Sequence, residues 1–226
     1  SMQAAGYETY HHGKKGNTAP LIQAKFQHNK YLENDTAERE SGEPGREIAD
    51  HAITFFKERD AAKPFFMYFS HGSVHAPLHA KVADIEAQRG RYDAGWDVLR
   101  EERFARMKAL GLVPESIELP PRNAEPGQEV APWDSLSADE QRLFARYMEV
   151  YAAMVTSIDD SFGRLRTALD QMGELDNTII VFTSDNGASR EGEAEGTTAY
   201  FVHLLGATDT AADLARGFQV SDKNPL

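Results

Sequence analysis

The chain has 226 residues, no cysteine, and 36 acidic against 24 basic side chains, which gives a formal net charge of −12. This length is enough to bury a sizeable core, and a composition of 41% hydrophobic and 27% charged residues is ordinary for a globular protein. The composition excludes disulfides, thiolate metal sites and a cysteine nucleophile in this chain, and its acidic balance disfavours nucleic acid as a partner.

The sequence predicts no membrane-spanning segment. Its longest stretch without Asp, Glu, Lys or Arg is residues 64–80. That stretch contains three histidines, a glycine and two prolines, which is unlike a spanning helix. The sequence assigns the chain to no cellular compartment.

The first half of the chain predicts one helix and one strand. Residues 1–40 are polar and without clear periodicity, and we expect them to be irregular. Apolar residues then recur at helical spacing, which predicts a helix over residues 46–59. The wholly apolar run at residues 65–70 is typical of a strand buried on both faces.

Two further helices are predicted in the middle of the chain. An apolar stripe followed by Gly111 predicts a surface helix over residues 93–110. The Pro-rich, acidic residues 114–134 then predict an ordered excursion over the surface. The capping box at residues 137–140 opens a helix of about 35 residues, with Gly163 as the place where it would break.

Residues 178–183 form a second apolar run, which predicts a second buried strand. From residue 189 onward the chain is rich in Gly and Ala and acidic, and we expect short helices there but no further core strand. Alternation of helices with buried strands predicts an α/β fold, in which a mostly parallel central sheet is flanked by helices.

Ligands of open α/β sheets bind beyond the carboxyl ends of the strands. Polar residues follow both predicted strands: His71, Ser73, His75 and His79 after the first, and Ser184, Asp185 and Asn186 after the second. If the two strands are parallel and close in the sheet, these side chains converge on one site.

The chemistry of these residues leaves two interpretations open. Asp185 and Asn186 offer hard oxygen ligands that suit Ca²⁺ or Mg²⁺, but Asp-Asn-Gly is also a common turn sequence. His75 and His79 have the chemistry to contact an anion or protonate a leaving group, or are ordinary loop histidines. Lys14 is a candidate contact for an anionic substrate, or a solvated lysine.

Three segments taken together resemble the sulfatase family of the alkaline phosphatase superfamily. Residues 5–10, leading to Gly13-Lys14, resemble the family's A-G-Y-x-T followed by G-K. Residues 63–69, leading to residues 75–78, resemble K-P-F-F-x-Y followed by P-H-x-P-L. Residues 175–187 are similar to the family's L-D-N-T-hydrophobic-S-D-N-G. The resemblance implies an alkaline-phosphatase-like α/β fold.

The resemblance also implies hydrolysis of a small-molecule sulfate ester, as in arylsulfatases. Asp185 and Asn186 match the motif that supplies oxygen ligands to the family's divalent cation, usually Ca²⁺, with Mg²⁺ as the alternative. Lys14 matches the lysine that binds sulfate and the oxygen of the nucleophile. His75 matches the histidine that contacts sulfate and protonates the leaving oxygen, and we expect His79 to contact the substrate as well.

The sequence departs from the family pattern in four places. Gly16 stands where the family has a histidine, and the motif C/S-x-P-x-R of the formylglycine nucleophile is absent. No aspartate pair precedes Gly6, and the family's later active-site lysine has no clear match before Leu226. We therefore expect residues 1–226 to be a partial sulfatase catalytic domain, inactive alone, with formylglycine outside the chain. Residues 90–135, approximately, are a helical, Pro-rich insert similar to that of large bacterial arylsulfatases.

Two other functions stay open on this reasoning. A phosphomonoester or phosphonate hydrolase of the same superfamily would use the same metal frame. A non-catalytic relative would keep the fold and bind an anion, and the glycine at position 16 favours this second alternative.

Overall fold

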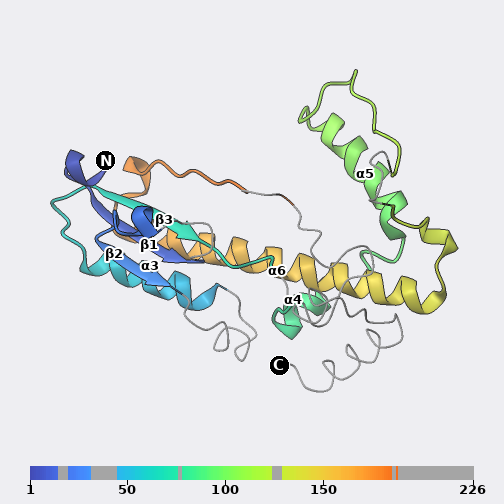
Figure 1. Cartoon of the computed structure of the whole chain (residues 1–226), viewed down its shortest axis with the longest axis horizontal. Coiled ribbons are helices and arrows are strands. Elements are labelled where there is room, and N and C mark those ends of the chain that lie inside the picture. The colour runs from blue at the N-terminus through green and yellow to red at the C-terminus, as the bar shows by residue number, and fades with distance from the viewer. Residues whose placement is uncertain (15–19, 32–44, 76–77, 124–128, 185–186, 188–226) are drawn as a thin grey trace.

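The computed structural model of the chain describes residues 1–14, 20–31, 45–75, 78–123, 129–184 and 187. These residues form an elongated molecule with a parallel three-stranded sheet at one end (Figure 1). A long helix runs from the sheet to the other end. The strand order is β2-β1-β3, with bounds Glu8–Gly13 for β1, His28–Tyr31 for β2 and Phe65–Ser70 for β3. Both pairings are parallel.

The strand at residues 65–70 is confirmed, but its predicted burial on both faces is not, because its residues are half-buried and Tyr68 is exposed. β1 and β2 lie where the sequence predicts irregular chain, and that prediction is wrong. β1 is the central strand, and all its residues from Thr9 to Gly13 are buried despite its polar sequence. Its His11 ring packs between the rings of Phe26 and Tyr68, at centroid distances of 5.1 and 4.9 Å. Histidine here fills an aromatic position in the core, and its burial lowers the pKa of His11.

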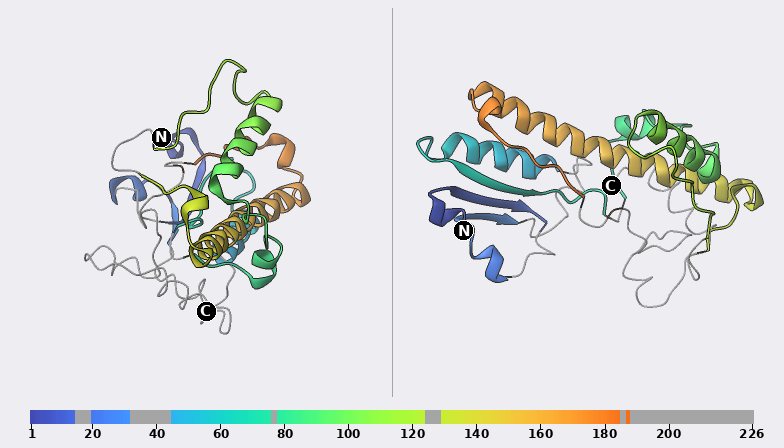
Figure 2. Two further views of the ribbon diagram at one scale, coloured as in Figure 1. Left: turned by 90° about the vertical axis from the view of Figure 1, so that its right-hand side faces the viewer. Right: turned by 90° about the horizontal axis from the view of Figure 1, so that it is seen from above.

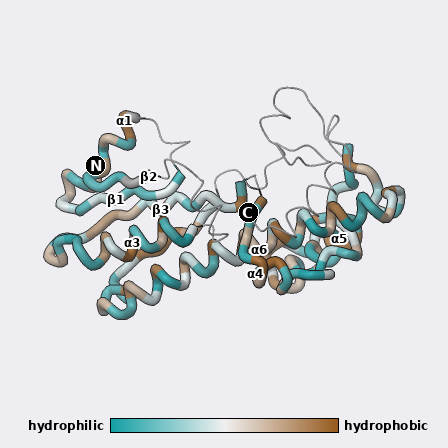
Figure 3. The backbone as a smooth tube through the Cα atoms, turned by 90° about the horizontal axis from the view of Figure 1, so that it is seen from below, coloured by the Kyte–Doolittle hydropathy of each residue, from teal (hydrophilic) through white to brown (hydrophobic). Residues whose placement is uncertain are grey.

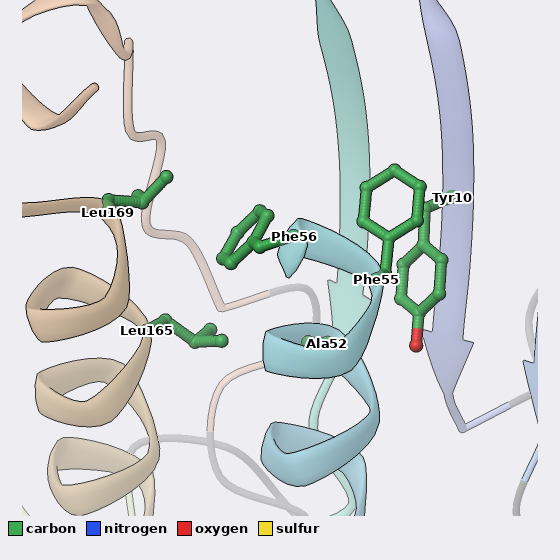
Figure 4. Close-up of a cluster of buried hydrophobic side chains, with 6 residues drawn as sticks. All are labelled: Tyr10, Ala52, Phe55, Phe56, Leu165 and Leu169. Atoms are coloured by element: carbon green, nitrogen blue, oxygen red, sulfur yellow. The ribbon is translucent and has the colours of Figure 1, made fainter. Parts of the chain in front are cut away.

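One face of the sheet is covered by α3 (Arg46–Glu58), which confirms the predicted helix. The tube of α3 alternates between hydrophobic and hydrophilic residues (Figure 3), as expected for a helix with one buried side. Tyr10 of β1 stacks on Phe55 of α3 with ring centroids 4.5 Å apart. The core continues from these rings across α3 to α6 (Figure 4), through Tyr10, Ala52, Phe55, Phe56, Leu165 and Leu169.

The long predicted helix is confirmed as α6 (Ala138–Gln171), which begins at a complete capping box between Ser137 and Glu140. It runs through Gly163 without the break considered from the sequence. Its carboxyl half packs on α3, and its amino half continues beyond the sheet to contact α4 (Val82–Glu86). In the described ranges no helix combines the length and the apolar character needed to cross a membrane.

The predicted surface helix is confirmed as α5 (Gly95–Ala109), which projects from the amino end of α6 (Figure 2). Trp133, in the 3-10 turn η2 (Trp133–Ser135), is buried against it, and its backbone N–H donates to Asp97 Oδ2 at 3.0 Å. A Cβ at Gly95 would overlap the Trp133 ring, so this position admits only glycine. The remaining short elements are η1 (Gln3–Ala5), α1 (Pro20–Gln23) and η3 (Leu175–Asn177).

The predicted second strand at residues 178–183 is not formed. The segment is extended and runs in the same general direction as β3 (Figures 1 and 2), but no strand pairing within the described residues includes it. Ile179, Val181 and Phe182 are 92%, 81% and 73% exposed. An apolar run forms a buried strand only where a neighbouring strand pairs with its backbone N–H and C=O groups.

Arg59 ties together three elements at the end of the sheet where β3 begins. Its side chain is 3% exposed, and its guanidinium pairs with Glu174, which follows α6. It also donates to the Lys63 carbonyl at 3.0 Å and lies 4.9 Å from the centroid of the Phe65 ring. A buried guanidinium depends on its counter-charge, because its desolvation is costly.

Glu174→Ala is therefore expected to lower the free energy of unfolding by about 2 kcal/mol, since the buried charge of Arg59 would lose its partner. The loss is smaller than for a fully buried pair because the Glu174 side chain is 33% exposed. Urea unfolding of the variant and the parent chain measures the difference. Asp139→Ala is the control, because it removes one partner from the exposed pair with Arg142 and should cost less. Equal losses in the two variants would contradict a special role for the buried guanidinium.

Candidate active site

The carboxyl ends of β1 and β3 lie side by side at one edge of the sheet. The register places Gly13 opposite Ser70, and the next backbone N–H, that of Lys14, donates to the Ser70 carbonyl at 2.8 Å. The chain segments that carry Lys14 and His75 therefore leave the sheet at the same edge, which is where open α/β sheets bind ligands.

Gly13 makes this close approach possible. Its φ is 104°, and a Cβ at this position would overlap the Ser70 carbonyl oxygen. Any larger residue would push the two strand ends apart and strain the backbone. The glycine of the Gly-Lys pair thus sets the place of the lysine, whose side chain is exposed.

His75 is half-buried and lies five residues beyond β3. Its backbone N–H donates to the Gly72 carbonyl at 3.2 Å, which closes a turn directly after the strand. His79 is also half-buried and follows four residues later. Both histidines therefore belong to the segment that starts at the same sheet edge as Lys14.

Asp185 and Asn186 lie outside the described residues. On either side of them, the Gly187 N–H donates to the Ser184 hydroxyl at 3.2 Å. Within the described ranges, no group of three or more His, Asp or Glu side chains is arranged to hold a metal ion. The donor chemistry of Asp185 and Asn186, a carboxylate and an amide oxygen, fits a hard divalent cation.

His11 and His12 lie three and two residues before Lys14, yet both rings lie in the sheet core. They point to opposite faces of β1, as successive strand residues do. The His12 ring lies 5.1 Å from that of His51 on α3, measured between centroids, whereas His11 packs on Phe26 across the sheet. Their burial separates them from the exposed strand end where Lys14 lies.

His71 is a polar residue whose environment the sequence does not reveal. It follows β3 directly, and its ring is bonded on both nitrogens: Nδ1 accepts from the Ser73 backbone N–H at 3.0 Å, and Nε2 lies 3.3 Å from Ser161 Oγ on α6. Burial lowers the pKa of His71 to about 4, so the ring is neutral near pH 7. Its partner Ser161 is 90 residues away in the sequence, which is why no local motif indicates the contact.

The shifted pKa predicts a pH dependence of stability. Between pH 6.5, the ordinary pKa of histidine, and about 4, the unfolded chain binds a proton at His71 that the folded chain does not. Stability rises with pH wherever the unfolded state binds more protons, so the free energy of unfolding should fall as the pH decreases through this window.

His71→Gln removes the titrating group, and the fall in stability between pH 6.5 and 4 should become shallower than in the parent chain. Urea unfolding at several pH values measures both profiles. Their difference isolates His71, because the carboxylates that protonate in the same window are common to both proteins. Parallel profiles would show that this ring does not carry the predicted shift.

Comparison with known proteins assigns the family. The sequence profile of the sulfatase family matches residues 1–216. The chain therefore belongs to the sulfatase family, and its parallel sheet flanked by helices fits the alkaline-phosphatase-like α/β fold.

Individual relatives agree with this assignment. The chain is 42% identical over 141 residues to an uncharacterised sulfatase of Schizosaccharomyces pombe, covering 62% of this chain and 25% of that protein. It is 34% identical over 136 residues to an arylsulfatase of Klebsiella aerogenes, covering 60% and 28% of the two chains. It is 30% identical over 140 residues to the multifunctional alkaline phosphatase superfamily protein PehA of Trinickia caryophylli, covering 62% and 26%. The matched region thus amounts to about a quarter of each relative.

Proposed function

We propose that this chain is part of a sulfuric ester hydrolase of the arylsulfatase type, which hydrolyses a small-molecule sulfate ester. Membership of the sulfatase family supports the proposal. The observation that carries it is the hydrogen bond from the Lys14 N–H to the Ser70 carbonyl, because it joins the two strand ends from which the candidate residues emerge.

Lys14 and His75 have complementary roles in this proposal. A sulfate monoester is an anion, and negative charge builds up on its leaving oxygen as the sulfur–oxygen bond breaks. The Lys14 ammonium binds the sulfate oxygens, and His75 donates a proton to the leaving oxygen. His79 contacts the substrate. Since the chain as a whole carries a charge of −12, attraction of the substrate depends on these local groups.

Sulfatases generally use a divalent metal and a formylglycine. In this chain Asp185 and Asn186 would supply two oxygen ligands to such a metal, and we propose Ca²⁺, with Mg²⁺ as the alternative. When bound, the cation supplies positive charge next to the sulfate. The nucleophile and the remaining ligands are expected from residues outside this chain.

We also propose that residues 1–226 are a partial catalytic domain, with residues 90–135, approximately, as an insert. The length of the relatives supports this, and so does the exposure of the four consecutive apolar side chains Ile179, Ile180, Val181 and Phe182. Burying one such side chain contributes about 1.5–3 kcal/mol. A further strand of the same domain, paired with residues 178–183, would bury several of them.

If this proposal holds, the backbone amides of residues 179–182 should exchange at least about tenfold more slowly in the full-length protein than in residues 1–226 alone. Hydrogen exchange followed by mass spectrometry measures this. A peptide from α3, residues 47–57, is the internal control and should be protected in both proteins. Equal, rapid exchange of residues 179–182 in both proteins would refute the additional strand.

In the full-length protein, Lys14→Ala should lower kcat/KM for an aryl sulfate by about 100-fold, because the developing charge loses a cation. His75→Ala should lower kcat more for phenyl sulfate than for 4-nitrophenyl sulfate, since the poorer leaving group depends more on protonation. Lys63→Ala, which removes an exposed lysine near the other end of β3, is the control and should retain activity.

Steady-state kinetics with both substrates measures these effects. Retention of full activity by Lys14→Ala would contradict the assignment. A full-length protein that prefers phosphate monoesters would overturn the proposed substrate class, and one without activity on either ester would favour a non-catalytic relative.

A further inference from the structure

We propose that His71 is a positioning residue for the candidate active site: its neutral ring anchors the turn that carries His75 to helix α6 and to the start of α3. This inference rests on the proposed function and deepens it. His71 itself is not expected to touch the substrate.

The hydrogen bonds around the ring define one tautomer. Because Nδ1 accepts from the Ser73 backbone N–H, the proton of the neutral ring lies on Nε2. Nε2 then donates to Ser161 Oγ, 3.3 Å away. The Ser161 hydroxyl donates in turn to the Gly45 carbonyl at 3.4 Å, directly before α3. Each group in this series donates to the next, so the series has one consistent direction.

The ring also fits closely against the backbone of α3. A Cβ at Gly45, where φ is 83°, would overlap the Nε2 end of the His71 ring. Burial lowers the pKa of the ring, in agreement with the neutral tautomer. A protonated ring would direct a second N–H at the Ser73 N–H, and the anchoring bond would be lost.

The anchor is connected to His75 through the turn. The Gly72 carbonyl, between His71 and Ser73, accepts the His75 N–H at 3.2 Å. The Ser73 hydroxyl lies 3.3 Å from Ser157 Oγ. Ser157 and Ser161 are four residues apart and so lie on one side of α6. The turn before His75 therefore rests on two serines of one helix, and its place depends on the His71 ring.

This arrangement predicts an effect on the chemical step rather than on substrate binding. Lys14 belongs to another strand end and keeps its bond to Ser70 when the ring is lost. His75 would be displaced, and a proton donor displaced by about 1 Å loses much of its effect. A histidine that only contributes to folding would change stability and leave the rate of each folded molecule unaltered.

The test is steady-state kinetics of the full-length protein with phenyl sulfate and 4-nitrophenyl sulfate, corrected for the folded fraction. His71→Ala should lower kcat for phenyl sulfate about tenfold or more, leave KM within about twofold, and lower kcat for 4-nitrophenyl sulfate less. His71→Asn should recover part of the loss, because its amide oxygen replaces Nδ1 as acceptor for the Ser73 N–H. Ser161→Ala should show a smaller loss of the same kind.

Ser137→Ala is the matched control. It removes another serine hydroxyl from the same helix, where it caps the amino end, and should lower stability without changing kcat. If His71→Ala does not fold, Ser161→Ala and His71→Asn carry the test.

Either folded variant, His71→Ala or Ser161→Ala, overturns the inference if its kcat and leaving-group dependence match those of the parent. A parent protein that is inactive on both sulfates would instead refute the proposed function. In that case, the exchange rate of the Ser73 and His75 amides decides the anchoring role. They should exchange faster in Ser161→Ala than in Ser137→Ala, and equal rates would overturn it.

Discussion

β1 lies between β2 and β3, and its parallel pairing with β3 ends with Gly13 opposite Ser70. At that point the two backbones approach so closely that only glycine fits, and the Lys14 N–H bonds to the Ser70 carbonyl. This contact determines where the segments that carry Lys14 and His75 begin. It also fixes the register of β1, whose Tyr10 side chain packs on Phe55 of α3. The same core cluster extends from α3 to α6. The core and the candidate site therefore share one constraint.

The helices contribute to the site by what they anchor. α3 and α6 together cover the sheet face on which Tyr10 lies, and the first turn after β3 rests on the serines of α6 that contact His71 and Ser73. At the opposite end of β3, the Arg59 guanidinium links the end of α3 to the residues after α6. β3 is thus held to the helices at both ends, which keeps its carboxyl end in a fixed place relative to them.

Patterns visible in the sequence predicted those elements whose burial follows a simple period. The sequence predicts helices over residues 46–59 and 93–110, a strand over 65–70 and a long helix after residue 137, because their apolar spacing or their caps are local. The structure has these elements at residues 46–58, 95–109, 65–70 and 138–171. β1 was missed because its buried histidines look polar in a sequence, and only the rings around them make them core residues. Residues 178–183 are predicted as a strand but pair with no strand in the described part of the chain, because an apolar run contains no information about its pairing partner. The motifs indicate Lys14 and His75. The surroundings of His71 depend instead on Gly45 and Ser161, which are 26 and 90 residues away in the sequence, so no local motif reveals them.

The most direct test of the central claim is a crystal structure of the full-length protein with sulfate, the reaction product, bound. Pairing of β1 with β3 should bring the Lys14 ammonium and the His75 ring into contact with the same sulfate ion. A sulfate that is bound by neither side chain, or by only one of them with the other directed elsewhere, would contradict the claim that this sheet edge forms the active site.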